Sequence, residues 1–180
     1  MRPLALLFPV LLSATSLLAQ PDPVASPWEG QSLPNIRPGD ARIREVLVDI
    51  HARSATFREI VRRIETSSVV VFVRSGRCAE RVRACLHVLG GQGPARTLRI
   101  TVDIFSTGGA PLAGLFGHEL QHAAEIVAEA SVRDAASLEA FYASHGRRTS
   151  AGFETDQARI VERQVEREVS RRRVTGVRWR

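Results

Sequence analysis

The sequence predicts an α+β fold in which a small antiparallel sheet packs against helices and residues 117–122 lie on a central helix. Two patterns support this class. Apolar residues recur at spacings of three and four in several stretches, as amphipathic helices require, whereas other stretches carry the continuous or alternating apolar residues of strands. With 180 residues, of which 44% are hydrophobic, the chain is long enough for one domain with its own core.

The N-terminus is predicted to be a secretory signal peptide covering residues 1–19. Arg2 precedes an apolar run from Leu4 to Leu18, and the small residue Ala19 stands before a polar break. We therefore expect cleavage near Ala19 and an exported protein, periplasmic or secreted, with an uncleaved membrane anchor as the alternative. Residues 20–40 are rich in proline and are predicted to be an extended leader, so the domain is expected to span residues 41–173.

The basic residues say little about partners. All 25 of them are arginines, and they are concentrated towards the C-terminus, where residues 174–180 are predicted to be a basic tail. Such a tail can contact an anionic surface. We therefore expect at most a weak contact with anionic lipid or polysaccharide, and the predicted export argues against a nucleic-acid partner.

Four helices are predicted from apolar periodicity. The second is expected to be capped by Ser54 or Thr56, the third to begin near Pro111, and the last to run over residues 153–173. The buried positions expected for the four helices are, in order, Ile43, Val46, Leu47 and Ile50; Phe57, Ile60, Val61 and Ile64; Leu112, Leu115, Phe116, Leu120, Ala123, Ile126 and Val127; and Ala158, Val161 and Val165. The stripe of the last helix, extended back by one turn, reaches Glu154.

Three stretches carry strand patterns. Val69–Val73 is continuous and β-branched, which predicts a strand covered on both faces. Leu86–Leu89 and Leu98–Phe105 are predicted to form a hairpin closed by the glycine-rich residues 90–94. The second arm of this hairpin precedes the central helix, and we expect its edge to pair with an extended peptide.

Cys78 and Cys85 are the only cysteines. In an exported protein such a pair is most simply a disulfide. One straight helix would separate their Cα atoms by about 10 Å, which is too far for the bond. The disulfide therefore requires a bend between the two cysteines.

The central helix carries the pattern His118-Glu119-Leu120-Gln121-His122. One helical turn separates the two histidines, so both imidazoles leave the same face and can bind one metal ion. Glu119 can then act as general base toward a metal-activated water. On a helical projection the histidines point away from the apolar stripe and share their face with Glu125 and Glu129, which are candidates for holding the imidazoles in place.

A catalytic zinc site needs a third protein ligand, which one straight helix does not easily supply. Glu154 is the favoured candidate, because a carboxylate at the head of a buried stripe needs a partner. The alternatives are Glu125 or Glu129 on the central helix and His145, Asp134 or Asp156 elsewhere.

A strand, a helix carrying His118 and His122, and a later helix carrying Glu154 together resemble the zincin metallopeptidases, in their glutamate-ligand branch, the gluzincins. The stretches 118–129 and 153–158 also resemble small exported bacterial proteins that carry this motif and have no assigned substrate. The resemblance implies a minimal zincin-like domain that binds Zn2+ through His118, His122 and Glu154, with Glu119 as base and proton shuttle.

The chain departs from these families at several positions. Glu125 and Ala128 stand where metzincins have glycine and histidine, which excludes that branch, and Ala158 replaces the usual gluzincin aspartate. Tyr142 and His145 are the candidates for a transition-state donor, with Arg147 nearby.

The predicted function is hydrolysis of peptide bonds in a peptide or protein substrate by an exported zinc metallopeptidase. The alternative is a non-catalytic exported metal-binding or envelope-associated protein on the same scaffold.

Overall fold

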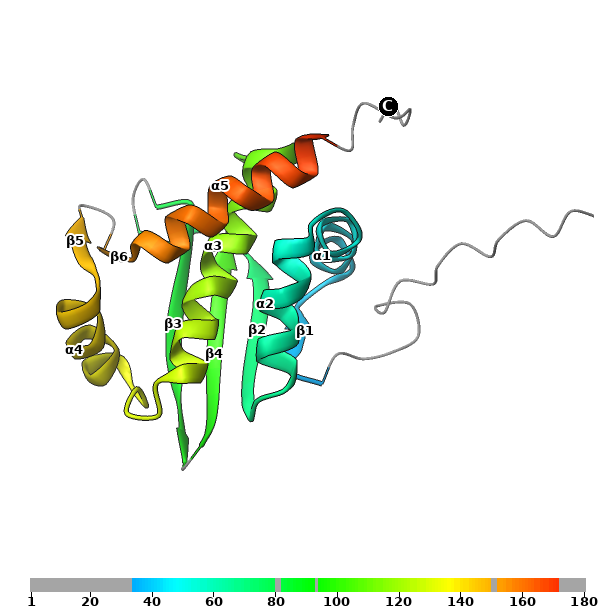
Figure 1. Ribbon diagram of the computed structural model, residues 1–180. Coiled ribbons are helices and arrows are strands. Elements are labelled where there is room, and N and C mark those ends of the chain that lie inside the picture. The colour runs from blue at the N-terminus through cyan, green and yellow to red at the C-terminus, as the bar shows by residue number, and fades with distance from the viewer. Residues whose placement is uncertain (1–33, 80–81, 93, 150–151, 172–180) are drawn as a thin grey trace, which may run out of the picture.

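The computed structural model describes residues 34–79, 82–92, 94–149 and 152–171 (Figure 1). The predicted signal peptide and basic tail lie outside these residues. In chain order the elements are β1 (Ile36–Pro38), α1 (Ala41–Arg53), α2 (Ala55–Glu65), β2 (Val69–Ser75), β3 (Ala84–Gln92), β4 (Ala95–Val102), α3 (Gly109–Ala128), α4 (Ala135–His145), β5 (Arg147–Thr149), β6 (Gly152–Glu154) and α5 (Asp156–Arg171).

The main sheet is mixed and mostly parallel, with the strand order β1-β2-β4-β3. β2 pairs in parallel with β1 and with β4, and only β3 and β4 form an antiparallel hairpin. The predicted α+β class is confirmed, but the prediction of an antiparallel sheet is wrong. The helix pair α1–α2 forms a crossover that makes β1 and β2 parallel. β3 does not pair with β2. After β3 the chain turns back, and β4 lies between β2 and β3 and pairs with both.

The two N-terminal helices begin at residues that cap them. Asp40 accepts a hydrogen bond from the backbone N–H of Ile43, and Ser54 accepts one from the N–H of Phe57 over 3.0 Å. Each cap satisfies one of the N–H groups that have no partner inside the helix. Of the two caps predicted for α2, the structure therefore uses Ser54.

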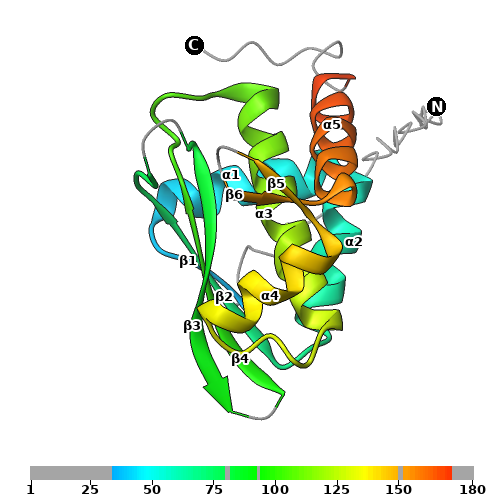
Figure 2. The ribbon, with the colours of Figure 1, turned by 90° about the vertical axis from the view of Figure 1, so that its left-hand side faces the viewer.

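Helices cover one face of the main sheet. In Figure 2, α2, α3 and α5 lie to the right of the strands, and Figure 1 shows α4 beyond the edge formed by β3. The inward side chains of β2 and β4 are fully buried under these helices: Val69, Val71, Val73, Leu98, Ile100 and Val102. On the opposite face Phe72 is 40% exposed and Arg74 is exposed. The prediction that Val69–Val73 is covered on both faces is therefore wrong, because no described helix packs on that second face.

α3 lies between the sheet and α5, with α5 crossing it closely (Figure 1). Two glycines of α3 permit this crossing. A Cβ atom on Gly117 would lie 2.8 Å from Val165 Cγ2, and one on Gly114 would lie 2.5 Å from Glu166 Cγ. Both distances are shorter than van der Waals contact, so α5 can approach this closely only where α3 has no side chain.

The predicted last helix begins later than expected. α5 starts at Asp156, where Thr155 caps it by accepting a hydrogen bond from the N–H of Ala158 over 3.1 Å. Glu154 lies on β6, the second strand of a small hairpin with β5. Gly152 has a φ of 127°, which favours glycine and allows the chain to enter β6. The prediction that Glu154 lies on a helix is therefore wrong.

The predicted disulfide is confirmed. Cys78 and Cys85 are bonded with their Cα atoms 6.1 Å apart, which is much closer than one straight helix would place them. Among the described residues no helix is long and apolar enough to cross a membrane.

Candidate metal centre

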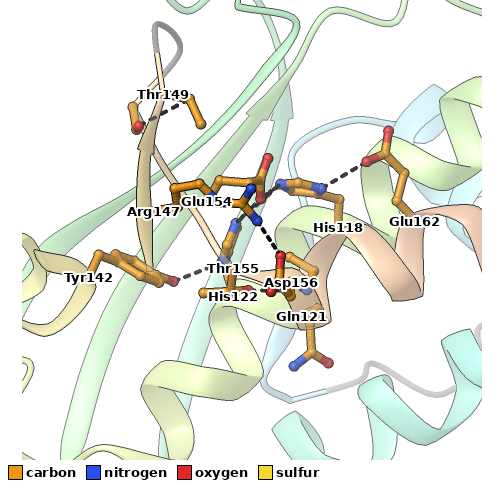
Figure 3. A network of polar contacts seen from close by, with 12 residues as sticks. His118, Gln121, His122, Tyr142, Arg147, Thr149, Glu154, Thr155, Asp156 and Glu162 are labelled. Atoms are coloured by element: carbon orange, nitrogen blue, oxygen red, sulfur yellow. Dashed lines mark hydrogen bonds and ion pairs between the residues drawn. The ribbon is translucent and has the colours of Figure 1, made fainter. Parts of the chain in front are cut away.

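His118, His122 and Glu154 converge on one point between α3 and β6 (Figure 3). The Nε2 atoms of the two histidines are 3.1 Å apart. Glu154 Oε1 lies 3.3 Å from His118 Nε2 and 3.7 Å from His122 Nε2. Three atoms that can bind a metal therefore form a small triangle, and the three side chains come from two separate elements.

Carboxylates bind the other nitrogen of each imidazole. Glu162 Oε2 of α5 lies 3.1 Å from His118 Nδ1, and Glu125 Oε2 of α3 lies 2.9 Å from His122 Nδ1. The hydrogen bond from His118 lowers the pKa of Glu162. Burial raises the pKa of Glu125, but His122 together with hydrogen bonds from Thr155 and Gln121 outweighs it and lowers that pKa. Because ionised carboxylates only accept hydrogen bonds, both Nδ1 atoms donate and both Nε2 atoms present lone pairs. This pairing is the usual way in which carboxylates orient metal-binding histidines.

A cation satisfies this arrangement. Glu154 Oε1 is buried and has no hydrogen-bond partner among the described residues. It faces the lone pairs of two imidazoles, so three electron-rich atoms meet with nothing positive between them. Zinc held by nitrogen and oxygen at about 2.0–2.2 Å in tetrahedral geometry keeps its ligand atoms roughly 3.3–3.5 Å apart. The observed separations of 3.1, 3.3 and 3.7 Å fit that geometry.

A proton would compete with a metal for the same place. Burial lowers the pKa of His122, but the hydrogen bond with Glu125 and the nearby carboxylates of Glu154 and Glu119 outweigh it and raise that pKa to about 9. The carboxylates therefore attract positive charge to His122, either as a proton or as a bound cation.

Glu119 lies beside the triad and is 6% exposed. Burial raises the pKa of its carboxyl, and the charges of His122 and His118 lower it. The two histidines are therefore its nearest electrostatic partners. Glu119 also lines the cavity in front of the triad.

A cavity of about 350 Å³ opens in front of the triad. His118, Glu119, His122 and Glu154 line its inner end. The rest of the wall is mostly apolar and comes from the edge strand β3, from α4 and from β6: Val82, Ala84, Leu86, Val88, Leu138 and Phe153. The three-residue triad therefore has access to a space large enough for part of a substrate.

Glu125 and Tyr142 support His122. The Tyr142 hydroxyl lies 2.9 Å from His122 Nδ1 and donates to Glu125 over 3.3 Å. Glu125 Oε1 also accepts a hydrogen bond from Thr155 over 2.8 Å, which links α3 to the start of α5 next to Glu154. The Tyr142 hydroxyl therefore contacts the Nδ1 side of the His122 imidazole, which faces away from Glu154 (Figure 3).

The other candidate residues make different contacts. Glu129 accepts a hydrogen bond from the N–H of Ser131 at the end of α3, and His145 is exposed and stacks on Phe141. Asp134 caps α4, and Asp156 pairs with Arg147. Of the third ligands considered, Glu154 is the one that the structure brings to both histidines.

Glu162 is the residue that the sequence interpretation missed. It lies on α5 beside the apolar stripe of Ala158, Val161 and Val165, four residues after Ala158. That spacing puts it on the margin of the buried face. Glu166 shares this margin of α5, so the spacing alone does not single out Glu162.

No protein-family model matches the chain, and no curated protein or solved structure is significantly similar to it. The resemblance to zincins therefore rests on the motif residues and on the His118–His122–Glu154 arrangement.

Proposed function

We propose that this protein is an exported, zinc-dependent metallopeptidase of the zincin type. One observation carries the proposal. The buried Glu154 Oε1 and the two Nε2 lone pairs converge beside Glu119 at the inner end of an open cavity. The disulfide between Cys78 and Cys85 supports export, because such bonds are typical of oxidising compartments.

The donor set favours zinc. Two imidazoles and one carboxylate are a common ligand set of catalytic zinc, whereas magnesium and calcium prefer sites built from oxygen alone. Bound there, zinc would supply Lewis acidity to a carbonyl oxygen and to a water molecule.

Three protein ligands support a catalytic rather than a structural site. Structural zinc sites are closed by four protein ligands, and catalytic sites keep one position open. Here the described residues offer three, and the cavity borders them. The non-catalytic metal-binding alternative remains the second candidate, and activity measurements separate the two.

Glu119 is the proposed general base. It would take a proton from the attacking water and deliver it to the leaving amine. Its near-complete burial and the raised pKa of its carboxyl suit a group that must hold and release a proton near neutral pH. Glu125, Tyr142 and Glu162 would orient the histidines rather than touch the substrate.

The proposed substrate is an extended peptide bound along β3. β4 cannot accept it, since β4 lies between β2 and β3; the expectation that the edge of Leu98–Phe105 binds a peptide is therefore wrong. β3 is at the end of the sheet, and its residues 84–88 line the cavity. Backbone groups on that edge can pair with an added strand.

The test compares metal content and hydrolysis in wild type and Glu119→Gln. Wild type should purify with one zinc per chain and cleave an unstructured protein substrate. Glu119→Gln should keep the zinc and lose hydrolysis by at least about a hundredfold. Glu45→Gln, on the exposed surface of α1, is the matched control and should behave like wild type.

Two results would contradict the proposal in different ways. Absence of stoichiometric zinc from wild type would remove the metal site itself. Stoichiometric zinc without hydrolysis of any of a broad set of peptides would favour the non-catalytic alternative.

A further inference from the structure

The second face of the main sheet carries a row of cationic and aromatic side chains. Arg37 of β1 pairs in register with Phe72 of β2, Phe72 with Arg99 of β4, and Arg99 with His87 of β3. Neighbouring strands are about 4.8 Å apart, so the row crosses the sheet over roughly 15 Å. Arg74 lies two residues after Phe72 and therefore points to the same side. We call these five residues the cationic sheet face.

This face lies opposite the helices. In Figure 2 the helices α2, α3 and α5 lie to the right of the strands, and this face is turned away from them. Arg37, Phe72, Arg74 and His87 are exposed, and Phe72 is 40% exposed. The metal centre lies on the other side of the sheet. His87 also lines the cavity in front of that centre, so the cationic sheet face meets the cavity at the β3 edge.

The charge of the face is not balanced by the strands themselves. The four strands read IRP, VVVFVRS, ACLHVLGGQ and ARTLRITV, which contain four arginines and no aspartate or glutamate. One of these arginines, Arg96, points into the core, so three arginines remain on the open face. Every ion pair found in the described residues involves helices, the β5–β6 hairpin or both.

One of the face residues lacks the partner that such a group usually has. Arg99 Nε is buried and has no hydrogen-bond partner among the described residues. Burial lowers the pKa of His87, and the charges of Arg99 and Arg74 lower it further, so the two arginines supply the positive charge and His87 adds a neutral imidazole beside them. An anion on this face would offset the positive charges of Arg74 and Arg99.

Apolar groups accompany the charges. Arg37 lies over the Phe72 ring, 5.5 Å from its centroid, and the ring is still substantially exposed. Leu89, two residues after His87 in the bulge of β3, is 50% exposed. A partner that offers only anionic groups would leave these apolar surfaces in water.

We propose that the cationic sheet face docks on an anionic lipid bilayer. A sheet face with arginines around an exposed phenylalanine suits a bilayer surface, where phosphate groups lie above acyl chains. The arginines would pair with lipid phosphates, and Phe72 would enter the interfacial region. This proposal does not depend on the proposed peptidase activity.

The experiment measures partitioning of the full protein between buffer and vesicles. Vesicles of phosphatidylcholine with 30% phosphatidylglycerol are compared with vesicles of phosphatidylcholine alone. The face variant combines Arg37→Gln, Arg74→Gln and Arg99→Gln. The control variant combines Arg44→Gln, Arg163→Gln and Arg167→Gln, which removes three exposed charges from helices. Both variants keep the arginine-rich C-terminus, so its contribution is the same in both.

Wild type should bind the anionic vesicles at 0.1 M salt and bind the neutral vesicles far more weakly. Each arginine near an anionic bilayer strengthens binding about fivefold, so the face variant should lose on the order of a hundredfold and the control variant much less. Phe72→Ser should weaken the part of the binding that persists at 1 M salt, where charges are screened. An unchanged circular dichroism spectrum would show that each variant is folded.

Equal losses in the two triple variants would overturn the proposal, as would the absence of wild-type binding to anionic vesicles. A face variant that binds vesicles like wild type but no longer binds a soluble sulfated polysaccharide would assign the face to a polysaccharide, and this too would overturn it.

Discussion

Glu162 Oε2 lies 3.1 Å from Nδ1 of His118, although the two residues are 44 positions apart in the chain. The contact joins the middle of α5 to the motif helix α3. It fixes which nitrogen of His118 carries the proton and thereby turns the Nε2 lone pair toward Glu154. The close crossing of the two helices is therefore part of the metal centre.

Glu162→Gln should weaken metal binding. A neutral amide accepts the Nδ1–H bond less strongly, so the imidazole becomes a poorer and less fixed ligand, and we expect a loss of about 10–100-fold in zinc affinity. Competition with a chelator of known affinity measures this loss. Glu166→Gln, one turn along α5 where the side chain lies against Gly114, is the matched control. Equal losses in both variants would show that the Glu162 contact has no special role.

The core and the motif were predictable because their signals are local. Apolar spacing identified the buried positions of α1 and α2, and alternation identified the inward side of β4, where Leu98, Ile100 and Val102 are fully buried. Two histidines one turn apart could be placed on one face from helix geometry alone. Glu154 was found through the stripe of α5, even though it lies on the strand before that helix.

The remaining features depend on tertiary arrangement. The directions of the strands are set by the α1–α2 crossover and by the return of β4 between β2 and β3. These pairings join segments that are distant in the chain, so no local sequence pattern reveals them. β1 consists of Ile36–Pro38 within a proline-rich stretch, so it is too short to show a strand pattern. Glu162 escaped notice because arginine and glutamate occur all around α5, and only the crossing with α3 distinguishes it.

Arg96→Gln should destabilise the fold. Arg96 is 4% exposed, and its Nη1 atom donates to the carbonyl oxygens of Ile126 and Glu129 at the end of α3. Removing the guanidinium leaves buried carbonyls without donors, at a cost of about 2–4 kcal/mol in the free energy of unfolding. Urea denaturation measures this change. Arg99→Gln, on the open face of the same strand, should cost less than about 0.5 kcal/mol; a comparable loss there would argue against the capping role of Arg96.

Glu168 should make stability depend on acid pH. Burial raises the pKa of its carboxyl, but hydrogen bonds from Ser54, Gln164 and Thr56 outweigh it and lower that pKa from 4.5 to about 2. Since the folded pKa is depressed, the contribution to stability is complete above pH 4.5 and is lost as the pH falls toward 2. Glu168→Gln should cost about 1–3 kcal/mol at pH 7.

The measurement for Glu168 is the urea midpoint of wild type and Glu168→Gln at pH 7 and at pH 3. The difference between the two proteins should shrink at pH 3, because wild type has then lost part of the contribution that the variant lacks. A difference of constant size would mean that the carboxylate charge does not stabilise the contact between α5 and the start of α2.

Gly117→Ala should disturb the metal centre by moving α5. The new methyl group would lie 2.8 Å from Val165 Cγ2, so the two helices must separate. We expect a loss of about 1–3 kcal/mol in the free energy of unfolding. Because α5 carries Glu162, we also expect zinc affinity to fall at least about tenfold. Gly108→Ala is the matched control, since its Cβ would meet no atom within 4 Å and its φ is −135°.

A second substitution tests whether helix separation is the cause. Val165→Ala removes the methyl groups that the new Cβ would strike, so the double variant Gly117→Ala/Val165→Ala should bind zinc more tightly than Gly117→Ala alone. Such recovery is a non-additive effect between two residues in contact. If the double variant binds zinc as weakly as Gly117→Ala, the alanine acts within α3 itself and the spacing of the two helices does not control the geometry of His118.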